Sequence, residues 1–357
     1  MIHKFFKRAL LLSIVWFLAF GFYSIMRQFG QDVVDKPGLE IGEFVLVYII
    51  MGLAAGLVFG TVDTILPHNF SKRASFGNTV LLRSGLYFII FILLICLGIL
   101  GFSFFDKQKL TFREQFSFLF SEEMILVLCY CFIVVFQINF VKEVDTKFGP
   151  GNLLKMLLGS FHRPKEEDRI FMFLDLKSST TIAEKLGHLK YSQLIQDCFS
   201  DLKVISKYKA EIYQYVGDEA VMTWTLKNGL AESNCLGAFY RFKWCLQARS
   251  EYYQDSYGLV PQFKAGLNVG SVVVAEVGEE KREIAYHGDT INTAARIQSE
   301  CGKQEEEILI SNELCALLTP NDNYEFISKG EVQLKGKFQK TRIHAVREVT
   351  RDNEYHH

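Results

Sequence analysis

The sequence predicts two unlike parts, an α-helical membrane domain at the N-terminus and a separate α+β domain behind it. Four long stretches in the first 141 residues contain no Asp, Glu, Lys or Arg, whereas strand and helix patterns alternate from residue 169 onward. The 357 residues are enough for two domains of ordinary size. With 49% hydrophobic residues and a net charge of −1, the chain is neither disordered nor basic enough to predict nucleic-acid binding.

The uncharged stretches lie at residues 9–26, 44–62, 84–105 and 124–141. Each is close to the roughly 20 residues that an α-helix needs to cross the hydrocarbon core of a bilayer. A helix on a soluble protein needs a polar face, and none of these stretches has a charged one. We therefore expect four transmembrane helices in a membrane domain of residues 1–141. The first is expected to be a retained helix rather than a cleaved signal peptide, because no small-x-small cleavage site follows it.

Basic residues around these stretches favour a cytoplasmic location for both ends of the chain. Lys4, Lys7 and Arg8 precede the first stretch, and further basic residues lie between the second and third stretches and after the fourth. An even number of spans puts both termini on one side, and the excess of basic residues assigns that side to the cytoplasm. We expect a multi-pass protein of the cell inner membrane, and whether its membrane domain binds a ligand stays open.

Residues 142–168 predict a linker between the two domains. They contain a Gly-Pro-Gly breaker at 149–151, a short amphipathic helix at 152–158 and a charged run at 163–167. Such a segment either transmits motion from the membrane or is a passive spacer, and both interpretations stay open.

Residues 169–349 predict a ferredoxin-like α+β domain, followed by a tail of residues 350–357. Gly217-Asp218 has the character of a hairpin turn between two strands. The order βαββαβ with extra elements is that of a ferredoxin-like sandwich. The expected elements are strand 170–176, helix 178–208 with a break near Gly187, strands 210–216 and 219–225, helix 230–253, strand-rich 262–277, helix 290–299 and short strands to 349.

A strand that ends in a carboxylate is the first candidate site. The apolar strand reaches Asp175 and Leu176, and then Ser178, Ser179 and Thr180 open a helix. Free backbone N–H groups at a helix start can hold phosphate oxygens, and a carboxylate beside them can hold a cation that bridges those phosphates. Taken alone, Asp175 could equally be an ordinary helix cap.

The hairpin tip is the second candidate, because Gly217-Asp218 puts another carboxylate on a tight turn. Two such carboxylates on neighbouring strand ends would make a metal site for a nucleoside triphosphate. The alternative is an ordinary hairpin with Asp at its turn.

The helix that follows Gly288 is the third candidate. Asn292 and Arg296 are spaced four residues apart and therefore share one helix face. The guanidinium suits phosphate, and the amide suits ribose or base oxygens. The alternative is a capped amphipathic helix with an exposed Arg.

Together and in this order, these residues resemble the catalytic domain of class III nucleotidyl cyclases, the adenylate and guanylate cyclase family. The resemblance covers about residues 165–347. The membrane half is similar to the variable input domains of bacterial members. The resemblance rests on the strand ending at Asp175, the Gly217-Asp218 hairpin, the glycine-containing strand 263–270, the helix 288–296 and Leu334-Lys335-Gly336-Lys337.

The resemblance implies a membrane-bound adenylate cyclase that converts ATP into 3′,5′-cyclic AMP and pyrophosphate. Asp175 and Asp218 would bind two divalent cations, Mg²⁺ or Mn²⁺, with the backbone carbonyl of Leu176 as a further ligand. The ribose 3′-hydroxyl would attack the α-phosphate in line, and catalysis would consist mostly of positioning and charge stabilisation.

The resemblance also implies which side chains hold the nucleotide. Asn292 would orient the ribose, Arg296 would stabilise charge on the reacting phosphate, and Lys335 or its neighbour Lys337 would contact the terminal phosphates. In this family the site lies between two catalytic domains. A homodimer would therefore hold two equivalent sites, with the aspartates from one subunit and the Asn–Arg pair from the other.

The base pocket departs from the family pattern. Family adenylate cyclases usually have Lys, and guanylate cyclases Glu, where this chain has Gln214; the partner position is Ala285. A Gln amide both donates and accepts hydrogen bonds, so it does not choose between adenine and guanine. ATP is favoured because adenylate cyclases are the commoner bacterial members, with a guanylate or dual-specificity cyclase as the alternative.

Three other functions are weaker. A diguanylate cyclase would explain Gly217-Asp218-Glu219 but not the helix with Asn292 and Arg296. A catalytically inactive nucleotide-binding membrane sensor would not need the retained carboxylates. A transporter would need a polar path, and the uncharged spans do not suggest one.

Overall fold

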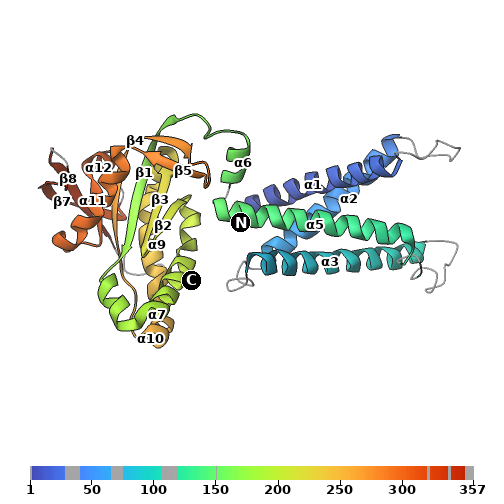
Figure 1. Cartoon of the computed structure of the whole chain (residues 1–357), viewed down its shortest axis with the longest axis horizontal. Coiled ribbons are helices and arrows are strands. Elements are labelled where there is room, and N and C mark those ends of the chain that lie inside the picture. Colours follow the sequence, from blue (N-terminus) through green and yellow to red (C-terminus); the bar gives the residue numbers. More distant parts are fainter. Residues whose placement is uncertain are drawn as a thin grey trace. The chain divides into compact units, whose positions relative to one another are not determined.

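The computed structural model describes residues 2–28, 41–65, 75–105, 117, 120–149, 151–319, 322–336 and 339–349. The chain divides into two compact units, Met1–Phe148 and Gly149–His357 (Figure 1). The predicted tail, 350–357, lies outside the described residues.

The first unit consists of long apolar helices. They are α1 (Ile2–Gln28), α2 (Ile41–Ile65), α3 (Phe76–Phe105) and α5 (Glu122–Phe148). In α1, α3 and α5 the described residues include stretches that are long and apolar enough to cross a membrane. The apolar stretch described in α2, Ile49–Asp63, is shorter. Three of the four predicted spans are therefore supported, and the span at 44–62 stays a prediction.

Glycines let α1 and α2 pack closely. A Cβ on Gly56 would lie 1.9 Å from Ser13 Oγ, and one on Gly60 would lie 3.0 Å from Ala9 Cβ. A Cβ on Gly52, four residues before Gly56, would likewise lie 2.9 Å from the backbone nitrogen of Phe17. Small residues at every fourth position allow helix backbones to approach inside a membrane. Successive glycines along α2 contact residues progressively nearer the start of α1, so the two helices run antiparallel.

Charged residues just outside the predicted spans meet in one layer, which we call the ion-pair layer (Asp63, Arg83, Lys142 and Glu143). Lys142 Nζ lies 2.5 Å from Asp63 Oδ2, and Arg83 Nη1 lies 3.3 Å from Glu143 Oε2. The Tyr87 hydroxyl also donates to Asp63. The end of α2, the start of α3 and the end of α5 therefore lie at the same level.

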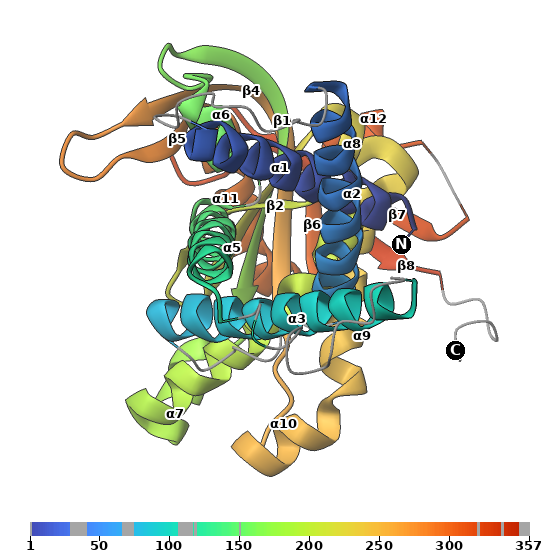
Figure 2. The ribbon, with the colours of Figure 1, turned by 90° about the vertical axis from the view of Figure 1, so that its right-hand side faces the viewer.

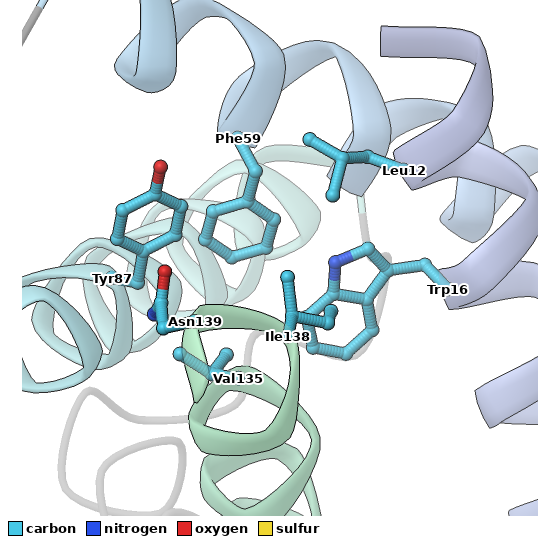
Figure 3. A pocket seen from close by; sticks show the side chains of 7 residues that line it. All are labelled: Leu12, Trp16, Phe59, Tyr87, Val135, Ile138 and Asn139. Atoms are coloured by element: carbon cyan, nitrogen blue, oxygen red, sulfur yellow. The ribbon is translucent and has the colours of Figure 1, made fainter. Parts of the chain in front are cut away.

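A small cavity lies inside the bundle (Figure 3). Its lining includes Leu12, Trp16, Phe59, Tyr87 and Asn139, and it has room for roughly one water molecule. Trp16 is 1% exposed, and its ring stacks on Phe59. Among the described residues, no group accepts a hydrogen bond from the Trp16 indole nitrogen.

The second unit is a mixed sheet with helices on both faces, which confirms the α+β class. The strand order is β2-β3-β1-β4-β6-β8-β7, with only the β4–β6 pairing parallel, and β5 pairs with the far half of β4 as a hairpin (Figure 2). The strands are β1 (Lys165–Leu176), β2 (Glu211–Val216), β3 (Glu219–Thr225), β4 (Phe263–Val277), β5 (Glu283–His287), β6 (Ile308–Ser311), β7 (Tyr324–Val332) and β8 (Thr341–Glu348). The α-helices are α6 (Asn152–Leu157), α7 (Ser179–Asp201), α8 (Leu226–Leu230), α9 (Asn234–Ala248), α10 (Ser250–Tyr257), α11 (Asp289–Gln304) and α12 (Asn312–Leu317).

Several elements differ from their expected bounds. Strand β1 begins at Lys165 rather than residue 170, because the charged run pairs its backbone with β4, Lys165 opposite Val274. The helix expected at 178–208 kinks at Gly187, as expected, but its last part, Leu202–Tyr208, is a 3-10 helix. The helix expected at 230–253 divides into α9 and α10 around Arg249.

Side chains of β1 alternate between two cores. Leu174 and its even-numbered neighbours pack with α7, α9 and α10 in the largest cluster of buried apolar residues. Phe171 packs on the opposite face with Ala294 of α11. Because successive strand residues point to opposite faces, Asp175 belongs to the face that α11 covers.

Candidate active site

Three acidic side chains gather where β1 meets the β2–β3 hairpin, and we call them the carboxylate cluster (Asp175, Asp218 and Glu219). Asp175 lies directly opposite Glu219 in the β1–β3 pairing. Gly217 makes the hairpin turn with a φ of +62°, a left-handed conformation that glycine adopts readily, and Asp218 follows it. The two predicted metal ligands are thereby brought together from separate strands.

The carboxylate cluster has more negative charge than its surroundings neutralise. Burial raises the pKa of Glu219 to about 7, with the charges of Asp175 and Asp218 adding to the rise. Burial also raises the pKa of Asp175, and the charge of Asp218 adds to it, while Lys264 and Gln298 act the other way. Crowded carboxylates of this kind are typical of sites that take up a cation or a proton.

One atom of the cluster fits a cation particularly well. Asp218 Oδ2 is buried and has no hydrogen-bond partner among the described residues. A buried polar atom without a partner is rare in folded proteins and needs an explanation. The described part of the chain contains no set of three His, Cys, Asp or Glu side chains with metal-ligand geometry. A cation here would therefore need backbone or phosphate oxygens as further ligands, as predicted for the carbonyl of Leu176.

Asp175 is held by two side chains that were not predicted from the sequence. Lys264 Nζ, from the neighbouring strand β4, lies 3.2 Å from Asp175 Oδ2. The Gln298 amide, from α11, donates a hydrogen bond of 2.8 Å to the same oxygen. One oxygen of the carboxylate is thereby restrained.

The start of α7, which was predicted to hold phosphate, has a backbone geometry compatible with that role. Ser178 precedes the helix in a left-handed conformation and makes no side-chain cap, and the first turn, which Ser179 and Thr180 begin, has no acidic residue. Its first amide groups therefore lack helical or capping partners and favour an anion. Tyr191, which was not predicted, shares a hydrogen bond with Ser179, and burial followed by the charge of Asp218 raises its pKa.

Helix α11 packs directly onto the sheet. A Cβ on Gly266 would lie 2.1 Å from the backbone nitrogen of Gln298, and one on Gly270 would lie 2.7 Å from Thr290 Oγ1. The glycines of the 263–270 strand thus allow the close approach of the helix. This contact fixes which residues of α11 face the sheet and which face away.

Asn292 and Arg296 face away from the carboxylate cluster of their own chain. Gln298 contacts Asp175 and is 5% exposed, whereas Arg296, two residues earlier, lies about 200° around the helix axis. Asn292 is exposed, and the Arg296 side chain is 29% exposed, with its Nη1 3.7 Å from Asp289 Oδ1. The predicted site residues therefore form two separate groups within one chain.

The predicted lysine loop belongs to the second group. A Cβ on Gly336 would lie 3.5 Å from Arg296 Nη2, so the turn of Lys335 and Gly336 runs beside the guanidinium. Lys335 is exposed. Lys337 lies outside the described residues, so which lysine contacts phosphate stays open.

The model of the adenylate and guanylate cyclase catalytic domain matches residues 163–348, just over half of the chain. The chain belongs to this cyclase family. It is 34% identical over 218 residues to "Adenylate cyclase 2" of Rhizobium meliloti (strain 1021), covering 61% of this chain and 60% of the relative. It is 28% identical over 191 residues to the receptor-type guanylate cyclase gcy-4 of Caenorhabditis elegans, covering 51% of this chain and 16% of that protein.

A solved structure supports the cyclase fold. A bacterial light-regulated adenylyl cyclase superposes with a TM-score of 0.54 at 17% identity, over 64% of this chain and 67% of that one. The cyclase domain, rather than the helical bundle, carries the family match, since the matched region begins at residue 163.

The two positions predicted to line the base pocket lie on strands that an aromatic contact joins. Gln214 is exposed on β2, and Ala285 is half-buried on β5. Their chain neighbours Tyr213 and Tyr286 pack edge to face with ring centroids 5.0 Å apart. The side chains that would read the base therefore remain a neutral amide and a methyl group.

Proposed function

We propose that this protein is a membrane-bound adenylate cyclase that converts ATP into 3′,5′-cyclic AMP and pyrophosphate for intracellular signalling. The proposal rests chiefly on the carboxylate cluster, in which Asp218 Oδ2 is buried without a hydrogen-bond partner among the described residues. Family membership supports cyclase chemistry, and the adenylate cyclase relative supports ATP as the substrate.

The two groups of site residues support a site that two subunits share. Within one chain Asp175 contacts α11 through Gln298, while the exposed Asn292 and the partly exposed Arg296 lie on another face of the same helix. A second subunit that supplies Asn292 and Arg296 would complete the site, and a homodimer would contain two such sites.

Each residue then has a chemical role. The amide groups at the start of α7 would bind phosphate oxygens, Asn292 would orient the ribose, and Arg296 and Lys335 would hold negative charge on the phosphates. Two divalent cations, Mg²⁺ or Mn²⁺, when bound by Asp175 and Asp218, would acidify the ribose 3′-hydroxyl and neutralise the triphosphate. The Leu176 carbonyl would be a further ligand, and phosphate oxygens of the nucleotide would supply others.

The membrane part of the proposal is carried by the three long apolar helices. The ion-pair layer and the antiparallel packing of α1 on α2 support a bundle in which the start of α1 and the end of α5 lie on one side. The basic residues assign that side to the cytoplasm of an inner-membrane protein. A ligand of the bundle that is larger than a water molecule would have to widen the small cavity around Trp16 or bind elsewhere.

A guanylate or dual-specificity cyclase is the second candidate, because receptor-type guanylate cyclases also match and Gln214 accepts either base. Purified protein with Mn²⁺ or Mg²⁺ should be given ATP and GTP separately, and the cyclic products measured. We expect cyclic AMP as the main product, with a higher kcat/KM for ATP than for GTP. The ratio of the two values should stay below about 10⁴, which is the discrimination reached by a pocket that hydrogen-bonds its substrate through polar groups. A higher ratio would contradict the neutral pocket, cyclic GMP alone would assign the second candidate, and no product would favour the inactive sensor.

A further inference from the structure

Gln298 occupies an unusual position between the two groups of site residues. Its side chain is 5% exposed and donates 2.8 Å to Asp175 Oδ2. Its backbone lies against Gly266, where any Cβ would clash. Gly266 pairs with Phe173, two residues before Asp175, so helix, strand and carboxylate are held together at one point.

The Gln298 amide differs from the other partner of Asp175 in an important way. Lys264 Nζ lies 3.2 Å from the same oxygen and neutralises its charge, so it competes with a cation. A neutral amide restrains the carboxylate but leaves its negative charge available. Both contacts fall on Oδ2, and in the described part of the chain no hydrogen bond or ion pair falls on Oδ1.

We infer that Gln298 is a positioning residue that orients the Asp175 carboxylate for a divalent cation, an inference that rests on the proposed function. Groups that hydrogen-bond a metal ligand fix its orientation, and their loss typically weakens metal binding by about 10- to 100-fold. Gln298 acts in the site of its own Asp175, whereas Arg296 on the same helix serves the other site of the dimer.

Gln298→Met tests this inference, because it keeps the volume of the side chain and removes the donor. Gln304→Met, at the end of the same helix, is the matched control. The thermal midpoint of each purified dimer should be titrated with Mn²⁺ in the presence of 3′-deoxy-ATP, which lacks the attacking hydroxyl. Bound cation raises this midpoint by mass action. We expect Gln298→Met to need about 10-fold more Mn²⁺ than wild type, and Gln304→Met to match wild type.

A dimer with one complete site separates positioning from general loosening of α11. Coexpression of an Asp175→Ala subunit with an Arg296→Ala subunit leaves one complete site, with Asp175 from the second subunit and Arg296 from the first. Gln298→Met in the second subunit should raise the Mn²⁺ concentration for half-maximal turnover about 10-fold. The same change in the first subunit should leave it unaltered.

These experiments distinguish failure of the Gln298 inference from failure of the proposed function. An active wild type whose Gln298→Met variant titrates like it, or equal effects from both subunits, would overturn the inference and leave the proposed function standing. A wild type that neither turns over nucleotide nor responds to Mn²⁺ would overturn both. A shift confined to Gln298→Met in the Asp175-supplying subunit supports the inference.

Discussion

The helical bundle and the catalytic unit both gather charged side chains, but they balance them differently. In the ion-pair layer each carboxylate faces a basic group from another helix. In the carboxylate cluster three acidic groups crowd together, and one buried oxygen has no partner in the described residues. Balanced pairs are explained by packing, whereas an unbalanced cluster lowers stability unless something else binds there. The difference supports the proposal that the cluster is the functional site.

The largest effect should come from removing a member of the cluster. Asp175→Ala or Asp218→Ala should reduce cyclase turnover at least about 100-fold, because the cations stabilise the transition state by several kcal/mol. The thermal midpoint of the metal-free Asp218→Ala protein should not fall, since repulsion is relieved and the lost Oδ2 has no hydrogen-bond partner among the described residues. Glu184→Ala, on the exposed side of α7, is a control that should behave like wild type. Substantial product from a folded Asp175→Ala enzyme would reject the metal assignment.

A second effect tests whether two subunits share the site. Asp175→Ala and Arg296→Ala should each be inactive as homodimers. With random pairing, half of the dimers are mixed and one of their two sites is complete, so coexpression should restore roughly a quarter of wild-type activity. Differential tags on the two subunits allow the mixed dimer to be purified and assayed. A mixed dimer without activity would contradict the shared site, as would a monomer that turns over substrate.

Residues whose surroundings are set locally could be predicted from the sequence. Asp175 ends an apolar strand, Asp218 follows a turn glycine, and Asn292 and Arg296 share a helix face by spacing alone. Such patterns need no knowledge of how distant segments pack. Their separation into two groups within the chain was implied by the family resemblance and not by any pattern.

Contacts between distant segments could not be predicted. Lys264 reaches Asp175 through the β1–β4 register, and Gln298 does so because α11 rests on Gly266. Tyr191 meets Ser179 within α7, across the kink at Gly187. The start of β1 was not predicted, because its side chains are charged and only its backbone pairing with β4 makes it a strand. One missed signal was visible: the α2 glycines at every fourth residue indicate close helix packing.

A third prediction sharpens the charge comparison through pH. The pKa of Glu219 is raised to about 7 in the folded protein, chiefly by burial. A carboxyl with a raised folded pKa stabilises the fold while protonated, so this contribution is full below the unfolded pKa and lost as pH rises through about 7. Glu219→Gln stays neutral and should avoid the loss. In EDTA, its thermal midpoint should exceed that of wild type by more at about pH 8 than at about pH 5. Equal differences at both pH values would contradict the crowding of the cluster.

The smallest effect should come from breaking the balanced region. Lys142→Ala removes one partner of Asp63, but the Tyr87 hydroxyl still donates to that carboxylate. Because both side chains are partly exposed, the loss should be at most about 1 kcal/mol, a fall of up to about 4 °C in thermal midpoint. The charge-reversed pair, Asp63→Lys with Lys142→Asp, should recover part of it.

Turnover per folded molecule is the measurement that decides what the ion-pair layer is for. A structural pair predicts that Lys142→Ala keeps the wild-type kcat, since the substitution leaves every residue of the carboxylate cluster in place. A tenfold change in kcat with an unchanged thermal midpoint would instead mean that the layer controls the catalytic unit through α5. Charge balance would then no longer distinguish a structural region from a functional one in this molecule.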